Sequence, residues 1–192
     1  MNNPTSKLSV TLQTMRTIQL TLSDRWELVM IPAGGCARNV NYGLEPKDVD
    51  VLVVGNFFND SEAFELITEL SANISRLGGS SRCYYAYEQG EVPMDSGRDF
   101  GQRLYACLKA EFPGCYPMDF LLQRATTVAD AIGGFDCNLN QYVILTTPEG
   151  CAKSSLYVPT PVDFPEDELV WIKPVTEQRK AKMEAFYQQY VR

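Results

Sequence analysis

The sequence contains no histidine among its 192 residues. Without histidine the chain cannot form a Ser-His-Asp or Cys-His catalytic site, or a metal site with imidazole ligands. Any catalysis must therefore depend on carboxylates, lysine, hydroxyls or thiols. The six cysteines include no Cys-x-x-Cys pair and lie in or beside apolar runs. We therefore expect them to be small buried residues rather than disulfide partners or zinc ligands.

Long apolar runs and positive charge are also scarce. No run approaches the roughly 18 apolar residues of a transmembrane helix, and residues 1–16 lack the basic-then-apolar pattern of a secretory signal. We therefore predict a cytoplasmic protein with no membrane partner. The formal net charge is −7, which disfavours general binding to nucleic acid but permits a local contact with one strand end.

Helical and strand-like patterns alternate along the chain, which predicts an α/β or α+β fold with a mixed central sheet flanked by helices. We expect helices over residues 7–22, 36–42, 60–77, 127–132 and 176–192, and one more that begins near Ser96 and carries Phe100, Leu104, Cys107 and Leu108. The helix over 60–77 has a capping box at Asn59 and Glu62 and an apolar stripe of Phe64, Ile67, Leu70, Ile74 and Leu77. Strands are expected over 26–31, 48–54, 81–87, 116–123 and 154–158.

The most informative segment is residues 34–50, GGCARNVNYGLEPKDVD. Asp48 and Asp50 begin an apolar strand, and residues two apart on a strand face the same side. Two carboxylates about 6 Å apart repel by roughly 3 kcal/mol at an effective dielectric constant near 20. A divalent cation would compensate for that repulsion, and oxygen ligands favour Mg²⁺ or Mn²⁺. The alternative is that Asp48 and Asp50 merely cap and solvate the start of the strand.

Gly34 and Gly35 precede an expected helix. Glycine lets the backbone approach a ligand closely, and the first N–H groups of a helix bind phosphate. Together with Asp48 and Asp50, this turn resembles the signature of the nucleotidyltransferase superfamily that includes DNA polymerase β and the CCA-adding tRNA nucleotidyltransferases. That signature is a Gly-Gly or Gly-Ser turn followed by Asp-x-Asp on a strand. The segment GGCARNVNYGLEPKDVDVLVV is closest to the CCA-adding type, with Asn39 where that family has aspartate.

The resemblance implies a third carboxylate from a later strand. Asp119 is the best candidate, because it is the lone acid in the apolar run YPMDFLL; Asp95 and Asp99 fall in an expected loop and at a helix cap. By the resemblance, the catalytic residues and ligands of two Mg²⁺ or Mn²⁺ ions would be Asp48, Asp50 and Asp119. Alternatively, Asp119 is a turn-edge residue or the buried partner of an arginine.

The resemblance also implies residues that bind the nucleotide. These would be Gly34, Gly35, Arg38, Lys47, Asp136 and Asn140. Arg38 and Lys47 would add positive charge to the leaving pyrophosphate or the sugar; alternatively, Arg38 pairs with an acid on a surface helix and Lys47 is simply solvated. Residues 135–144, FDCNLNQYVI, resemble the Arg-Asp-Phe-Thr-Ile-Asn-Ala segment of CCA-adding enzymes, with Phe135 in place of arginine. Asp136 could instead be a helix cap and Asn140 a buried polar residue.

The implied activity is that of a template-independent, metal-dependent nucleotidyltransferase. It would move a nucleoside monophosphate from an NTP such as ATP to a hydroxyl acceptor and release pyrophosphate. An RNA or tRNA 3′ end is the favoured acceptor, with proteins and small molecules as alternatives. The competing hypotheses are an inactive protein of the same fold that binds a nucleotide or inhibits a partner, and a hydrolase that reuses the acids.

The chain is expected to be a minimal, stand-alone form. Residues 1–160 would be the catalytic core, and 161–192 a proline-rich connection and a C-terminal helix packed on the same domain. PEDELVWI contains Glu166 and Asp167 but lacks the arginine with which CCA-adding enzymes select the base. The basic residues near the C-terminus are expected to be solvated: Lys173, Arg179, Lys180, Lys182 and Arg192.

Overall fold

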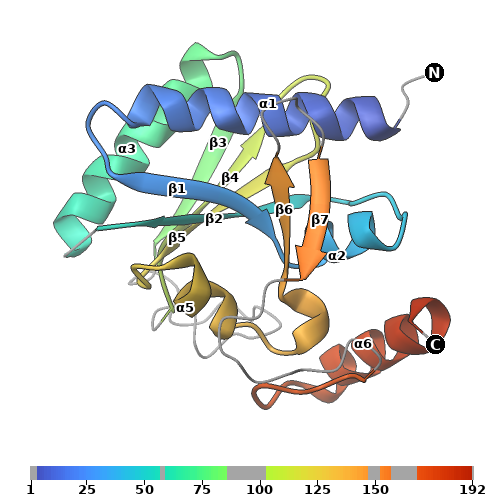
Figure 1. Cartoon of the computed structure of the whole chain (residues 1–192). Coiled ribbons are helices and arrows are strands. Elements are labelled where there is room, and N and C mark those ends of the chain that lie inside the picture. Colours follow the sequence, from blue (N-terminus) through green and yellow to red (C-terminus); the bar gives the residue numbers. More distant parts are fainter. Residues whose placement is uncertain (1–3, 57–58, 86–102, 147–151, 157–167, 192) are drawn as a thin grey trace.

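A computed structural model describes residues 4–56, 59–85, 103–146, 152–156 and 168–191. Its helices are α1 (Pro4–Leu22), α2 (Gly35–Asn41), α3 (Asp60–Arg76), α5 (Val128–Gly133) and α6 (Glu177–Tyr190), with a 3₁₀ turn, η2, at Asn138–Asn140. Its strands are β1 (Leu28–Ala33), β2 (Val49–Gly55), β3 (Ser80–Tyr85), β4 (Leu104–Glu111), β5 (Met118–Gln123), β6 (Tyr142–Thr146) and β7 (Ala152–Leu156). Figure 1 shows how these elements are arranged.

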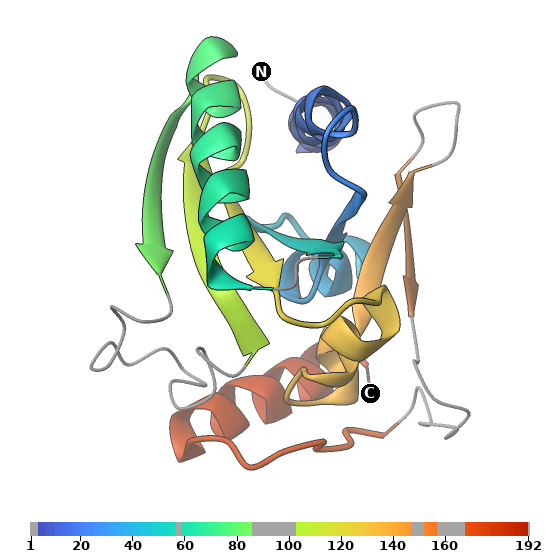
Figure 2. The same ribbon diagram turned by 90° about the vertical axis from the view of Figure 1, so that its left-hand side faces the viewer.

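The strands form one seven-stranded sheet in the order β3-β4-β5-β2-β1-β6-β7. β2 and β5 pair in parallel, whereas the other neighbouring strands pair antiparallel. In Figure 2, α1 and α3 cover one side of the sheet, whereas α5 lies on the other. The predicted fold class, a mixed sheet flanked by helices, is therefore confirmed.

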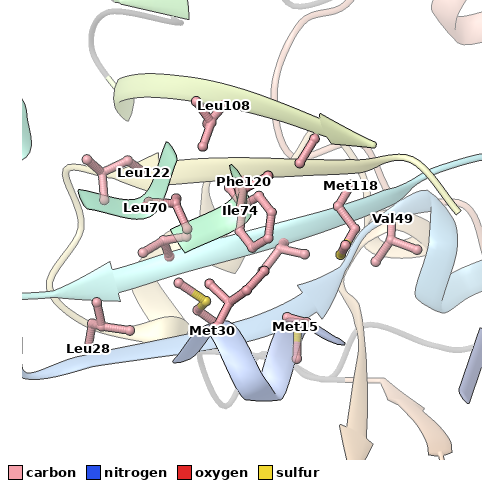
Figure 3. Packing of buried hydrophobic residues seen from close by; sticks show 14 of the residues in the cluster. Met15, Leu28, Met30, Val49, Leu70, Ile74, Leu108, Met118, Phe120 and Leu122 are labelled. Carbon is pink, nitrogen blue, oxygen red and sulfur yellow. The ribbon is translucent and has the colours of Figure 1, made fainter. Parts of the chain in front are cut away.

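The main core lies between the sheet and helices α1 and α3. Val49, Val51 and Val53 of β2 face this core, and they pack with apolar residues such as Ile18 of α1 and Leu70 of α3. Burying each large apolar side chain contributes roughly 1.5–3 kcal/mol. Figure 3 shows part of this packing around Phe120 and Met118. The alternate residues of β2 face the opposite side of the sheet, which leaves that side free to carry polar groups.

Helix α3 begins as its capping box predicts, because the Asn59 side chain accepts a hydrogen bond from the Glu62 N–H at 2.9 Å. The predicted apolar stripe is partly wrong. Phe64 and Leu77 are 52% and 43% exposed, and the buried face includes Leu66 instead. An apolar residue at helical spacing can still lie at the margin of the buried face, since the sheet covers only part of the helix.

The predicted helix carrying Leu104, Cys107 and Leu108 is wrong. These residues belong to strand β4, and Ser96, Asp99 and Phe100 lie outside the described residues. Ala106 and Leu108 of β4 belong to the main core, whereas Leu104 and Cys107 pack in a second cluster that includes Ile132 of α5, so β4 is buried on both faces. A strand that is apolar on both faces can match helical spacing by chance, because no clean alternation remains.

Helix α6 packs against the segment that precedes β6. Met183 and Tyr187 form a small buried cluster with Cys137 and Leu139, and Cys137 forms an isolated bridge with Trp171. The predicted proline-rich connection lies largely outside the described residues, and the domain boundaries at 160 and 161 stay a prediction. None of the described helices is both long enough and apolar enough to cross a lipid bilayer.

Candidate active site at the start of strands β2 and β5

Asp50 and Asp119 lie side by side on neighbouring parallel strands. They are register partners in the β2–β5 ladder, so their side chains extend from the same face of the sheet. That face is the one covered by α5, because Leu52 and Leu121, two residues further along each strand, belong to the α5-side core. We call Asp50 and Asp119 the acidic pair. The parallel register therefore brings together two carboxylates that are far apart in the sequence.

Asp48 lies in a bend just before β2 and is exposed, rather than standing within the strand as predicted. It still acts on the acidic pair. Burial first, and then the charges of Asp48 and Asp119, raise the pKa of Asp50 to about 7, although Lys109 and Arg179 oppose the rise. Negative charge is therefore concentrated around Asp50, beyond what the nearby cations offset.

Lys109 of β4 provides one of these cations. It is the register partner of Asp119, and its Nζ donates a hydrogen bond to Asp119 Oδ2 at 2.9 Å. That hydrogen bond and the carboxylate charge raise the pKa of Lys109. Within the described part of the chain, no three acidic or thiol side chains form a ready-made metal cluster. Of the three expected carboxylates, Asp50 and Asp119 are therefore adjacent, and Asp119 is bonded to a lysine. Asp48 lies in the exposed bend before β2.

The Gly34–Gly35 turn lies beside Asp50, because Ala33, which precedes the turn, is the register partner of Asp50. Gly34 has φ 70° and ψ −137°, a conformation that L side chains rarely adopt. A Cβ at Gly34 would lie 3.4 Å from Asp50 Oδ2, and one at Gly35 would lie 3.7 Å from an Arg38 Nη. The Gly34 N–H donates to the Tyr142 carbonyl at 3.0 Å, which anchors the turn to β6. The turn therefore separates Asp50 from Arg38 with no side chain of its own.

Arg38, Asn140, Asp136 and Arg179 form a second polar cluster, which we call the arginine network. Arg38 Nη1 donates to Asn140 Oδ1 at 2.7 Å, and Asn140 Nδ2 donates to Asp136 Oδ1 at 2.5 Å. Arg179 Nε donates to Asp136 Oδ2 at 2.6 Å. The network thus joins α2, the segment before β6 and α6.

Three expectations about these residues are wrong. Arg38 is 8% exposed and donates to the neutral side chains of Asn39 and Asn140, so it is not paired with an acid on a surface helix. Asp136 is not a helix cap, because Cys137 occupies the N-cap position of η2. Arg179 is not merely solvated, because it forms an ion pair with the buried Asp136.

Electrostatics distinguish the members of the network. Burial and the nearby Arg179 lower the pKa of Arg38, although the Asp136 charge opposes this change. Burial disfavours ionisation of Asp136, but hydrogen bonds from Arg179 and Asn140 outweigh that effect and lower its pKa. Asp136 is paired directly with Arg179, whereas Arg38 is linked to it only through Asn140. The network therefore has two guanidinium groups and one carboxylate, which leaves a surplus of positive charge beside the Gly34–Gly35 turn.

Two further side chains near the turn differ in what they can contribute. Lys47 is exposed in the bend before β2, and its proposed contact with the nucleotide stays a prediction. Cys36, at the start of α2, is 2% exposed. Burial, followed by the charges of Asp50 and Asp48, raises the pKa of Cys36 to about 12. The thiol therefore stays neutral, and it is a poor nucleophile or metal ligand near neutral pH.

Lys109 and Arg179 are the charged residues that the sequence did not place at the site. Lys109 would have been found had residues 104–111 been recognised as a strand beside Asp119. Arg179 had no comparable signal, because its contact with Asp136 depends on how α6 packs.

No protein-family model matches this sequence, and no curated protein matches it. Solved structures do share its fold. A tRNA-processing enzyme in an apo form aligns with a TM-score of 0.52 at 19% identity, covering 86% of this chain and 37% of that one. A CCA-adding enzyme in an apo form aligns at 0.50 and 14% identity, covering 87% and 34%. A tRNA-processing enzyme with CTP aligns at 0.50 and 16% identity, covering 90% and 40%.

The chain therefore shares its fold, the nucleotidyltransferase fold, with these enzymes. It spans between 34% and 40% of the length of these three solved chains. At these identities the likeness establishes the fold alone.

Proposed function

We propose that this protein is a metal-dependent, template-independent nucleotidyltransferase. It moves a nucleoside monophosphate from an NTP to a hydroxyl acceptor and releases pyrophosphate. The observation that carries this proposal is the acidic pair, in register on β2 and β5 and directly beside the Gly34 turn. The shared fold adds support, because it is the fold of enzymes described as CCA-adding and tRNA-processing.

The residues at the site suit a divalent cation. Burial, followed by the charges of Asp48 and Asp119, raises the pKa of Asp50 to about 7, so a nearby cation would stabilise its ionised form. Carboxylate oxygens are the ligands that Mg²⁺ and Mn²⁺ prefer. Asp48, Asp50 and Asp119 would hold two such ions. When bound, these ions would activate the attacking hydroxyl and neutralise charge on the triphosphate.

The chain's own groups would position the nucleotide. Gly34 presents no side chain toward Asp50, which leaves room for phosphate oxygens against the turn. The surplus positive charge of the arginine network lies on the other side of that turn and would attract the leaving pyrophosphate. Lys47 would add a further positive charge. In this arrangement only the backbone of Gly35, with no side chain, would lie between Arg38 and the phosphates.

In the proposed reaction the acceptor hydroxyl oxygen forms a bond to the α-phosphorus of the NTP. The bond between that phosphorus and the bridging oxygen of the pyrophosphate breaks. Asp119 would receive the proton of the attacking hydroxyl on its carboxylate. The protein contributes mainly by positioning and by electrostatic stabilisation, since phosphoryl transfer needs little covalent participation from side chains.

The test is transfer of a labelled α-phosphate. The protein is incubated with each NTP labelled at the α position, Mg²⁺ and a total cell lysate, and labelled products are separated into RNA, protein and small molecules. A parallel reaction of the purified protein with γ-labelled NTP and purified RNA, without lysate, should release labelled pyrophosphate. Release of free phosphate instead would indicate a hydrolase and contradict the proposal.

Asp50→Asn is the decisive variant. It should lower transfer by about 10²-fold or more, because it removes a charge on which the transition state depends. Asp24→Asn is the matched control, since Asp24 is an exposed acid in the turn after α1. Transfer by Asp50→Asn at the rate of Asp24→Asn would exclude this mechanism.

The ion pair between Lys109 and Asp119 favours a second candidate, a protein that binds NTP without transferring it. In that case Lys109 would permanently occupy the acid that a metal needs. The expected result would be NTP binding, measured by equilibrium dialysis, with no labelled product in any acceptor fraction. Labelled product in any fraction excludes this candidate.

A further inference from the structure

We propose that an exposed strip beside the acidic pair binds the 3′-terminal nucleotides of a single-stranded RNA acceptor. The strip consists of Arg82 and Tyr84 on β3 and Lys109 on β4, and we call it the cationic strip. This inference rests on the proposed transferase function and specifies its substrate class.

The cationic strip continues the row of charges that begins at the acidic pair. The strand registers align Asp50 with Asp119, Asp119 with Lys109, and Lys109 with Arg82. Directly opposed residues on neighbouring strands extend from the same face. Neighbouring strands are about 4.8 Å apart, so the charge changes from negative at Asp119 to positive at Arg82 within about 10 Å. The row therefore ends in two adjacent cations.

The strip is accessible and includes an aromatic surface. Arg82 is exposed, and the Lys109 side chain is 53% exposed. Tyr84 is half-buried and is the register partner of Cys107, which faces the α5 side of the sheet. The Arg82 guanidinium lies 5.1 Å from the centre of the Tyr84 ring. β3 is the last strand on this side of the sheet, so the strip lies at the sheet edge.

The direction of the reaction places the acceptor over this strip. In an in-line displacement the nucleophile approaches the phosphorus from the side opposite the leaving group. The Gly34–Gly35 turn and the arginine network lie on the β1 side of Asp50, where the pyrophosphate would leave. The acceptor must therefore approach from the other side of Asp50, which is the side of β5, β4 and β3.

The chemistry of the strip suits a nucleic-acid end better than a protein. Arg82 and Lys109 would bind phosphodiester oxygens, and Tyr84 would stack on an unpaired base. A serine or tyrosine hydroxyl of a protein acceptor brings no phosphate for these cations. The net charge of −7 confines attraction to this local strip, which suits a few terminal nucleotides rather than a duplex.

The test measures RNA binding in the absence of chemistry. The full chain is titrated into a fluorescein-labelled, unstructured oligoribonucleotide with a free 3′ hydroxyl, without NTP and with EDTA, and anisotropy is followed at several salt concentrations. Arg82→Gln should weaken binding about tenfold and lower the slope of log K against log salt by about 0.7. Tyr84→Ala should also weaken binding about tenfold, whereas Tyr84→Phe should bind nearly as wild type does.

Arg76→Gln is the matched control, because Arg76 is an exposed arginine on α3, which covers the opposite face of the sheet. Arg76→Gln should bind RNA as wild type does. Circular dichroism verifies that each variant is folded. Equal affinity and salt slope for Arg82→Gln and Arg76→Gln would overturn the inference, as would transfer to a protein acceptor that Arg82→Gln leaves unchanged.

Failure of the transferase proposal gives a different result. Asp50→Asn should bind the oligoribonucleotide at least as tightly as wild type, because it removes a negative charge beside the strip. If RNA binding depends on Arg82 but the protein transfers no label, the proposal for the cationic strip stands and the transferase proposal fails. If the protein transfers label to RNA and neither Arg82→Gln nor Tyr84→Ala changes the rate, the transferase proposal stands and the proposal for the strip fails.

Discussion

The acidic pair and the arginine network lie on opposite sides of the same glycine turn, and they satisfy their charges in different ways. In the network, the buried Asp136 accepts hydrogen bonds from Arg179 and Asn140, and its pKa is lowered. In the acidic pair, burial and then the like charges of Asp48 and Asp119 raise the pKa of Asp50 to about 7. One carboxylate is stabilised as an anion by its surroundings, and the other is destabilised.

This difference separates a structural role from a functional one. A carboxylate whose hydrogen bonds are satisfied helps to hold its elements together. Here Asp136 holds α6 against the segment that precedes β6. A carboxylate held among like charges lowers the stability of the fold, and such groups concentrate at sites that bind or react. We therefore assign positioning of the turn to the network and chemistry to the acidic pair. The substitutions below test this division through the free energy of unfolding and through ligand affinity.

Asp136→Asn should have the largest effect on stability. It removes the carboxylate that pairs with Arg179, and breaking a buried ion pair costs about 3 kcal/mol or more. Urea denaturation of the variant and of Asp24→Asn, an exposed acid, measures the loss. A loss of less than about 1 kcal/mol would mean that the network does not hold α6 in place.

Asp50→Asn should have the opposite effect, and the effect should depend on pH. The unfolded carboxyl has a pKa near 4 and the folded one near 7, so between these values the folded state binds more protons. The stability of the wild type should therefore fall as the pH rises from about 4 to 7, in EDTA. The variant should lack this fall and gain about 2 kcal/mol over the wild type at pH 8, a value discounted for the partial exposure of Asp50.

Parallel curves of stability against pH for the wild type and Asp50→Asn would contradict the contrast drawn between the acidic pair and the arginine network. They would show that Asp50 is as well compensated as Asp136. Acid-induced unfolding at lower pH is a separate effect, because the lowered pKa of Asp136 makes its contribution disappear only as the pH falls through that value.

Gly34→Ala and Gly43→Ala form a matched pair of substitutions whose effect on stability should be smaller than that of Asp50→Asn. Both glycines have similar positive φ values, 70° and 68°, but a Cβ at Gly43 would meet nothing within 4 Å. Each alanine should cost about 1 kcal/mol of backbone strain. Only Gly34→Ala should also lower NTP affinity, by about tenfold, because its methyl group would occupy the space beside Asp50. Equal NTP affinity in the two variants would separate the turn from the nucleotide site.

Much of the fold could be predicted because its elements carry local signals. Apart from Asp50, β2 is apolar as far as Gly55, and α3 has a cap at Asn59 that the structure confirms. β4 was misread as a helix because it is buried on both faces. That error hid Lys109, whose place beside Asp119 follows directly from the β4–β5 register.

The candidate site was predictable to the extent that one strand and one turn define it. Gly34 and Asp50 are near one another in sequence, and the structure places them side by side, since a Cβ at Gly34 would lie 3.4 Å from Asp50 Oδ2. Arg179 owes its position to the packing of α6 against the segment before β6. No local pattern encodes that packing, so an arginine on a terminal helix could not be distinguished from a solvated one.

Lys109→Met should have the smallest effect on stability and a clear effect on metal binding. The lysine is half-exposed, and exposed ion pairs contribute less than about 1 kcal/mol. Removing it takes a competing cation away from Asp119, so Mn²⁺ should bind severalfold more tightly, as measured by the electron paramagnetic resonance signal of free Mn²⁺. Lys182→Met, an exposed lysine on α6, is the control and should leave Mn²⁺ affinity unchanged. Weaker Mn²⁺ binding by Lys109→Met would show that the lysine supports the metal site instead of competing with it, and the acidic pair would then be better compensated than its charges indicate.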